Sequence, residues 1–457
     1  MRRLWYLTDR VRHRRTWSAL RTMKEGQAAD WSLVVGPRLE ALMEWSRQHV
    51  PAYATLPRAG GGHTDVLTLL DLLPIVTRDM LTEAPSAYTA DAVPRSAYWN
   101  STGGSTGVPL RVLQDDVYNA ESMAGKYLFY TWAGWSPEDR IVRIWGSYAE
   151  EVKRKPSFRQ HFSQWAYDIP QLDAYALREG DLDRYVTAIE RLRPAVIESY
   201  VGAAELLAEH IIEGHVSLRD RPRALIVSTG TLYPEWRQRM EHAFGCPVFN
   251  RYGTREAGDI ACSRGTDELI VNPYTHCIEI VDDDGQRITH GTGHVIVTVL
   301  NNRTMPLMRY DIGDYATVES AEVLFPKSGW QRLQSVDGRQ MTMLQGPYGM
   351  RLSPALLIGC IRQTTQESWF VRQYQVVQRG VDKFTFRLVL RPGRRTDEVA
   401  VQKSLENMRS GLMSVLGQQT RLDFEFVDHV EALPSGKVPF CLVRFDNEQQ
   451  GEGKSCG

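Results

Sequence analysis

Hydrophobic and polar positions alternate between two periods in the middle of the chain. Short apolar runs typical of buried strands are separated by stretches whose apolar residues recur at helical spacing. The strand-like runs are Arg140–Trp145, Ala195–Tyr200, Arg223–Val227 and Cys246–Asn250, and the helical stretches between them are Asp181–Leu192, Val201–Ile212 and Pro234–Phe244. Regular alternation of this kind predicts an α/β fold with layers of parallel strands and helices.

The pattern changes on both sides of this region. Residues 1–90 predict a helical lead-in, with apolar residues near helical spacing from Trp31 to Tyr53. After Tyr252, the runs Cys277–Val281 and His294–Leu300 predict antiparallel strands. The acidic stretch Asp282–Gly285 could hold a metal ion, but aspartates followed by glycine between two strands favour a hairpin turn.

Beyond Gly338 the chain predicts a small α+β unit. A strand-rich segment, Gln373–Leu390, is followed by a helix from Thr396 to Leu416 and a strand from Arg421 to Val427. We therefore expect a large domain of residues 1–338 and a small, mobile domain of residues 339–457, with the ligand site where they meet. The polar, glycine-rich residues 447–457 predict a disordered tail.

The composition limits the kinds of molecule that the protein is expected to bind. The 457 residues carry a formal net charge of −1, so no global field would attract nucleic acid or anionic lipid. The six cysteines show no paired spacing, which favours the reducing cytoplasm, and there is no apolar run long enough to span a membrane. The arginine-rich N-terminus favours a solvated basic helix face over a peripheral membrane helix. A homodimer is left open.

One glycine-rich segment indicates nucleotide chemistry. Glycine allows backbone N–H groups to surround a polyphosphate, and hydroxyl side chains add neutral donors. An ordinary flexible loop is the alternative. No Gly-Lys-Ser/Thr follows, which argues against a P-loop. The segment consists of Ser101, Thr102, Gly103, Gly104, Ser105, Thr106 and Gly107.

Four further patterns follow in order: Arg251–Gly258, Arg309–Asp314, Gly338-Arg339 and Leu433–Lys437. Together with the glycine-rich segment, they resemble the adenylate-forming superfamily of acyl-CoA synthetases, luciferases and adenylation domains over residues 60–445. Two details resemble most closely the phenylacetate:CoA ligase-like branch. They are the Tyr-Gly-Thr-Arg-Glu form of the first pattern and the residues Met305–Tyr310, which lead into the second.

The resemblance implies an ATP- and Mg²⁺-dependent enzyme that activates a small carboxylic acid as an acyl-adenylate, releases pyrophosphate and transfers the acyl group to coenzyme A. Glu256 would bind Mg²⁺ and Arg255 would contact the α-phosphate. Lys437, on a mobile turn, would orient the reacting carboxylate.

The nucleotide and the acid have separate candidate residues. Tyr252 would stack on adenine, Gly253 would leave room for the nucleotide, and Thr254 would also contact the nucleotide. Asp314 would accept the ribose hydroxyls, and Arg339 would approach the ribose or phosphate. The acid would lie at converging strand ends, where the aromatic residues favour a flat acid or simply pack in the core. These candidates are Trp145, Tyr148, Tyr200, Gly202, Ser228, Thr229 and Gly230.

Several residues depart from the family's pattern. Asp311 replaces the usual arginine and is expected to point away from phosphate, and Met341 replaces an acidic hinge residue. Some relatives hold zinc with cysteines and a histidine, but Cys262 lacks these partners, so no zinc is expected. Two alternatives stay open: an amide ligase with an amine acceptor, and a degenerate module that binds nucleotide without catalysis.

Overall fold

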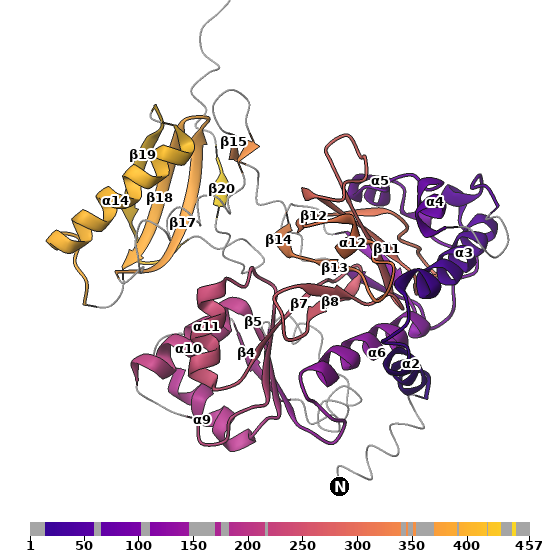
Figure 1. Ribbon diagram of the computed structural model, residues 1–457, viewed down its shortest axis with the longest axis horizontal. Coiled ribbons are helices and arrows are strands. Elements are labelled where there is room, and N and C mark those ends of the chain that lie inside the picture. The colour runs from indigo at the N-terminus through magenta and orange to yellow at the C-terminus, as the bar shows by residue number, and fades with distance from the viewer. Residues whose placement is uncertain are drawn as a thin grey trace, which may run out of the picture. The chain divides into compact units, whose positions relative to one another are not determined.

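The computed structural model describes residues 14–58, 65–101, 110–145, 170–174, 182–214, 218–339, 344–345, 351–352, 370–390, 393–417, 419–430 and 441–444 (Figure 1). These residues form two compact units, one ending at Gly338 and the other beginning at Arg339. Helices in the described part of the chain are too short or too polar to cross a membrane.

The first unit is built on an eight-stranded sheet in the order β13-β9-β8-β7-β6-β5-β3-β4. The strands from β3 to β7 pair in parallel, and β8 and β9 turn back antiparallel. The predicted parallel strands are confirmed. However, β7 is longer than expected because it continues into the Arg251–Gly258 pattern, called the Tyr252 motif below. The bounds are β3 (Ile141–Trp145), β4 (Gln171–Asp173), β5 (Val196–Tyr200), β6 (Ala224–Ser228), β7 (Val248–Thr254), β8 (Gly258–Ser263), β9 (Leu269–Val271) and β13 (Arg332–Leu333).

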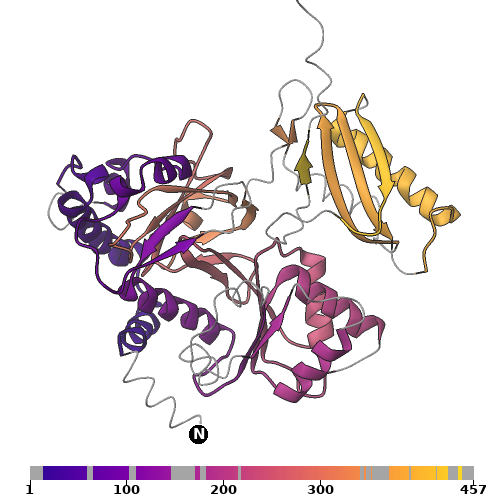
Figure 2. The same ribbon diagram turned by 180° about the vertical axis from the view of Figure 1, so that it is seen from behind.

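Helices cover both faces of this sheet (Figures 1 and 2). The predicted helices α9 (Leu182–Leu192), α10 (Val201–Glu213) and α11 (Pro234–Phe244) pack on one face through apolar residues such as Leu207 and Phe244. The other face carries α6 (Asp116–Trp132), against which α2 (Arg14–Glu25) packs. The sequence pattern did not predict α6, whose polar and apolar residues are mixed.

A second, antiparallel sheet has the order β10-β11-β12-β14, with β10 (His276–Val281), β11 (Gly291–Val299), β12 (Tyr310–Val318) and β14 (Ser335–Arg339). Asp282–Gly285 is a turn after β10, as predicted. The helices of the N-terminal region share a core with this sheet. They are α3 (Trp31–His49), α4 (Val66–Asp71) and α5 (Arg78–Glu83), with the 3₁₀ turns η1 (Pro51–Tyr53) and η2 (Pro85–Tyr88).

Short elements complete the first unit. Strands β1 (Tyr98–Ser101) and β2 (Arg111–Gln114) pair antiparallel, and they flank the glycine-rich segment. Helix α12 (Ala321–Leu324) follows β12. The strand that follows the glycine-rich segment is therefore paired with the strand that precedes it.

The second unit is an α+β structure. Its four-stranded sheet has the order β19-β18-β17-β20, with β17 (Val371–Gly380), β18 (Lys383–Leu390), β19 (Arg421–Phe426) and β20 (Cys441–Val443). Helix α14 (Val399–Leu416) packs on the sheet and shares a core with Phe384 and Phe386. A short pair, β15 (Leu344–Gln345) and β16 (Arg351–Leu352), lies in the same unit.

Candidate functional site

The Tyr252 motif, Arg251–Gly258, spans the end of β7 and the tight turn into β8. A Cβ atom on Gly253 would lie 2.5 Å from the carbonyl oxygen of Gly258, so only glycine fits there without a shift of the backbone. Gly258 has a φ of +86°, a left-handed conformation that favours glycine. The two glycines thus allow the chain to turn sharply and to place Thr254, Arg255 and Glu256 at the end of the strand.

Asp314 on β12 contacts this motif directly. The hydroxyl of Tyr252 donates a hydrogen bond of 2.7 Å to Oδ2 of Asp314. Asp314 is 2% exposed, and Tyr252 is half-buried. Two residues that the sequence assigned to adenine and ribose are therefore brought together although 62 positions separate them.

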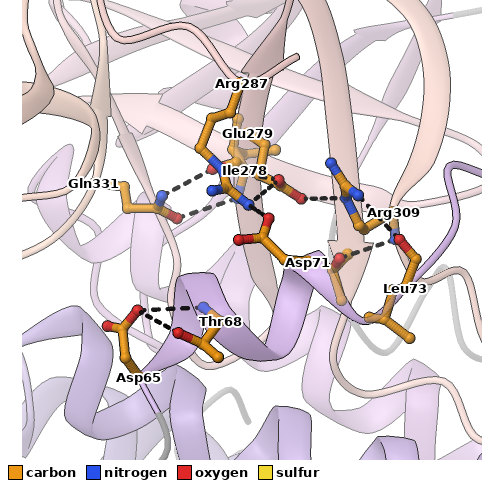
Figure 3. A network of polar contacts seen from close by, with 10 residues as sticks. Asp65, Thr68, Asp71, Leu73, Ile278, Glu279, Arg287, Arg309 and Gln331 are labelled. Atoms are coloured by element: carbon orange, nitrogen blue, oxygen red, sulfur yellow. Dashed lines mark hydrogen bonds and ion pairs between the residues drawn. The ribbon is translucent and has the colours of Figure 1, made fainter. Parts of the chain in front are cut away.

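The start of the Arg309–Asp314 motif is held by a buried polar network (Figure 3). Arg309 donates from Nε to Glu279 at 3.0 Å and from Nη1 to the carbonyl oxygen of Leu73 at 2.9 Å. Glu279 also contacts Arg287 at 2.8 Å, and Arg287 reaches Asp71 at 2.7 Å. Arg309 has a φ of +47°, a strained conformation that the network stabilises.

Asp311 closes the turn before Asp314. Its Oδ1 accepts a hydrogen bond of 2.9 Å from the backbone N–H of Gly313, whose φ is +78°. Its Oδ2 lies 3.8 Å from Nδ1 of His294. The carboxylate that replaces the family's arginine thus has a structural partner in its own turn.

The stem of the glycine-rich segment is hydrogen-bonded to the same motif. Asn100 on β1 donates to the carbonyl oxygen of Arg255 at 2.9 Å, and Gln114 on β2 donates to those of Arg255 and Glu256 at 3.4 and 3.3 Å. The Arg255 side chain donates to the carbonyl oxygen of Ser101 at 3.4 Å. No sequence pattern distinguishes Asn100 and Gln114 from ordinary strand residues, so neither was predicted as a site residue.

Glu256 is 1% exposed, and a buried histidine fixes the residue that follows it. Nε2 of His276 lies 2.8 Å from the carbonyl oxygen of Ala257, and its Nδ1 lies 2.8 Å from the hydroxyl of Thr275. Burial lowers the pKa of His276 to about 4, so the ring is neutral at pH 7. Because a carbonyl only accepts, Nε2 carries the proton. No pattern in the sequence signals this contact.

The candidate acid-binding residues lie at the carboxyl ends of neighbouring parallel strands. Trp145 ends β3 and Tyr200 ends β5, and their ring centroids are 4.3 Å apart. Ser228 ends β6 and is buried, and Thr229 follows it with a φ of +61°. A left-handed β-branched residue is strained, and such strain concentrates at functional sites.

Gly230 and Gly202 lie close to the same strand ends. A Cβ atom on Gly230 would lie 3.2 Å from Cβ of Val201, whereas Gly202 has open space around it in the first turn of α10. Parallel sheets bind ligands outside the carboxyl ends of their strands. The arrangement therefore supports an acid site at this edge without identifying the acid.

Some predicted residues lie outside the described residues. They are Thr102, Gly103, Gly104, Ser105, Thr106, Gly107, Tyr148, Met341 and Lys437. The backbone of Arg339 ends β14. Within the described ranges, no group of three or more histidine, cysteine, aspartate or glutamate side chains is arranged to hold a metal ion.

Comparisons with known proteins agree with this geometry at the level of the fold. No family model matches the chain. The protein CapK of Staphylococcus aureus is 25% identical over 346 residues, which cover 75% of this chain and 73% of CapK.

Two solved structures show the same architecture. A 2-hydroxyisobutyryl-CoA ligase in the postadenylation state, in complex with 2-HIB-AMP, has a TM-score of 0.67 at 18% identity over 91% of this chain and 89% of that chain. ATP-bound MatB from Rhodopseudomonas palustris has a TM-score of 0.52 at 15% identity over 75% of this chain and 66% of that chain. The chain thus has the fold of the adenylate-forming enzymes, which confirms the resemblance inferred from its motifs.

Proposed function

We propose that this protein is an ATP-dependent acid ligase, which activates a small carboxylic acid as an acyl-adenylate, releases pyrophosphate and transfers the acyl group to coenzyme A. The hydrogen bond between Tyr252 and Asp314 carries the proposal, because it joins two motifs that the resemblance assigns to one nucleotide. The contact of Arg255 with Ser101, the first residue of the glycine-rich segment, supports the same assignment.

The turn at Glu256 fits a bound Mg²⁺. Buried carboxylates in proteins are paired with cations or coordinate metals, and carboxylate and hydroxyl oxygens are the hard ligands that Mg²⁺ prefers. Glu256 supplies the carboxylate, and Thr254 supplies a hydroxyl that already accepts a hydrogen bond from the N–H of Ala257 at 3.2 Å. When bound, Mg²⁺ would neutralise phosphate charge during attack by the acid.

Each remaining candidate residue binds either the nucleotide or the acid. Asp314, oriented by Tyr252, accepts the ribose hydroxyls and so places the α-phosphate near Arg255. Arg255 and Lys437 stabilise the charge that develops as the carboxylate oxygen bonds to the α-phosphorus and pyrophosphate leaves. Arg339 binds the ribose or phosphate. The acid lies between Trp145, Tyr200 and the Ser228–Gly230 segment.

We also assign the protein to the phenylacetate:CoA ligase-like branch and to the cytoplasm. The Tyr-Gly-Thr-Arg-Glu form supports the branch. The scattered spacing of the cysteines, and the burial of the four within the described ranges, support a reducing compartment. The 2-hydroxyisobutyryl-CoA ligase has also been solved in complex with 2-HIB-AMP and CoA, which supports coenzyme A as the acceptor.

Acid-dependent exchange of radiolabelled pyrophosphate into ATP tests the proposal. A panel of carboxylic acids should include at least one that supports exchange, and Lys437→Ala should abolish that exchange. Adding either CoA or amines then separates a thioester from an amide product. Tight ATP binding without exchange on any acid would instead show a non-catalytic nucleotide-binding module.

A further inference from the structure

A buried cluster of charges lies beneath the candidate acid site. Glu198 on β5 is fully buried, and four groups converge on its carboxylate. These are the ammonium of Lys126 at 3.0 Å, Nε of Arg143 at 2.7 Å, Nη2 of Arg251 at 2.5 Å and the hydroxyl of Tyr130 at 2.7 Å. Burial alone would raise the pKa of Glu198, but the three cations hold it well below its ordinary value.

Positive charge exceeds negative charge in this cluster. Asp259 adds a second carboxylate, 3.2 Å from Nε of Arg251. Across the ranges that the structure describes, three cations thus face two carboxylates, which leaves one positive charge in excess. A buried charge without a counter-charge is costly, so an anion entering here would be stabilised.

The cluster touches the candidate acid site through Trp145. In the described part of the chain, Nη1 of Arg251 is buried and has no hydrogen-bond acceptor, and that side chain is 2% exposed. The guanidinium carbons of Arg143 and Arg251 lie 5.3 and 5.6 Å from the ring centroid of Trp145. Trp145 contacts Tyr200 at the strand ends, so the cations border the candidate acid site.

We propose that Lys126, Arg143 and Arg251 bind a second carboxylate at the far end of the substrate, so that the enzyme activates dicarboxylic acids. This inference rests on the proposed function. One excess positive charge matches one carboxylate, whereas a phosphate monoester carries about −1.5 to −2 charges at pH 7 and would leave the site negative. Arginine guanidinium groups also match the planar geometry of a carboxylate.

The carboxylate bound here is distinct from the one that reacts. Arg251 and Thr254 lie three positions apart on β7, which corresponds to roughly 10 Å between their Cα atoms, and Arg255 follows Thr254 in the turn. The reacting carboxylate must lie within bonding reach of the α-phosphate beside Arg255. The cluster therefore binds the opposite end of the acid.

Exchange assays with matched acids test this inference. Each dicarboxylate is paired with a monocarboxylate of similar shape whose far end is neutral, called its neutral twin. Terephthalate is paired with 4-methylbenzoate, and linear diacids of about four to eight carbons are paired with their monocarboxylate equivalents. We expect kcat/KM to favour the dicarboxylate by on the order of tenfold or more, since hydrogen bonds to charged groups are strong. Equal rates, or a preference for the neutral twin, would overturn the inference.

Variants at Lys126 then test whether the charged cluster causes the preference for dicarboxylates. Lys126→Met should lower kcat/KM for the dicarboxylate far more than for its twin, and Lys126→Arg should restore much of the difference. Lys327→Met, at an exposed lysine, is the matched control and should change nothing. A preference that survives in folded Lys126→Met overturns the assignment. If Lys126→Met does not fold, the acid panel with the wild-type enzyme still decides whether dicarboxylates are preferred.

The same panel separates the two proposals. Exchange with the monocarboxylates alone would leave the ligase function intact and refute the dicarboxylate specificity. Exchange on no acid would refute the ligase function itself. Calorimetric titration of the wild-type protein with terephthalate and 4-methylbenzoate provides a second readout that does not depend on turnover.

Discussion

Tyr252 and Asp314 share a hydrogen bond of 2.7 Å between a phenolic hydroxyl and a carboxylate oxygen. The bond ties the end of β7 to the middle of β12, and so links the two larger sheets of the first unit at one point. An aspartate with one oxygen held in this way has a defined orientation, on which the proposed contact with the ribose depends.

The nucleotide site should depend on this pair. Tyr252→Phe should raise the KM for ATP by about fivefold, which corresponds to the loss of one hydrogen bond worth about 1 kcal/mol. Asp314→Ala should have a larger effect and should also abolish discrimination between ATP and 2′-deoxy-ATP. Steady-state kinetics with both nucleotides measure this. Tyr315→Phe, which removes a hydroxyl bonded to His294 instead, is the control. Unchanged ATP kinetics in Asp314→Ala would refute the ribose assignment.

Glu256 should control the use of magnesium. Glu256→Gln keeps the size of the side chain but removes its charge, so the rate of exchange should fall by about 100-fold or more at a fixed Mg²⁺ concentration. The Mg²⁺ concentration required for half-maximal exchange should rise. Glu322→Gln, at an exposed glutamate in α12, should leave both values unchanged. Wild-type magnesium dependence in Glu256→Gln would show that the metal binds elsewhere.

Gly253 should not tolerate a side chain. In Gly253→Ala the new Cβ would lie 2.5 Å from the Gly258 carbonyl oxygen and 2.9 Å from Cα of Asp259, so the turn must shift. Overpacking of this kind costs about 1 to 3 kcal/mol in the free energy of unfolding. Urea unfolding measures the cost. Gly202→Ala, with nothing within 4 Å of the new atom, is the matched control, and its free energy of unfolding should change by about 0.5 kcal/mol or less. Equal stability of the two variants would contradict the close approach.

His276 should make folding sensitive to acid. Its pKa is about 4 in the folded chain against an ordinary value of 6.5, so the folded state disfavours the charged ring. The unfolded chain therefore binds a proton first as the pH falls. The stability that His276 contributes is complete above pH 6.5 and is lost progressively between pH 6.5 and 4, with a total of ~3 kcal/mol.

Substitution of this histidine by glutamine tests the prediction. His276→Gln retains a donor for the Ala257 carbonyl and removes the titration, so its free energy of unfolding should fall less between pH 6.5 and 4 than that of the wild type. Urea unfolding at a series of pH values measures the difference. His242→Gln, at an exposed histidine in α11, should follow the wild-type curve. Parallel curves for His276→Gln and the wild type would show that the ring is not buried in neutral form.

Local patterns were sufficient for most of the parallel region. Apolar runs such as Arg223–Val227 predicted strands because a buried parallel strand needs apolar side chains on both faces. The helix from Pro234 to Phe244 begins with a proline and ends before Gly245, which are the residues that suit those positions. Helix α6 was missed because it carries polar residues toward the charged cluster as well as apolar residues toward the core.

The sequence by itself determined the order of strands and helices and the motifs of an adenylate-forming enzyme, since both depend on residues that are near one another in the chain. Only the tertiary structure decided that Tyr252 meets Asp314, that Gln114 and His276 hold the Glu256 turn, and that three cations surround Glu198. Those contacts join residues from different strands and helices. Their energies arise from burial and hydrogen-bond geometry, which exist only once the sheets and α6 have packed together.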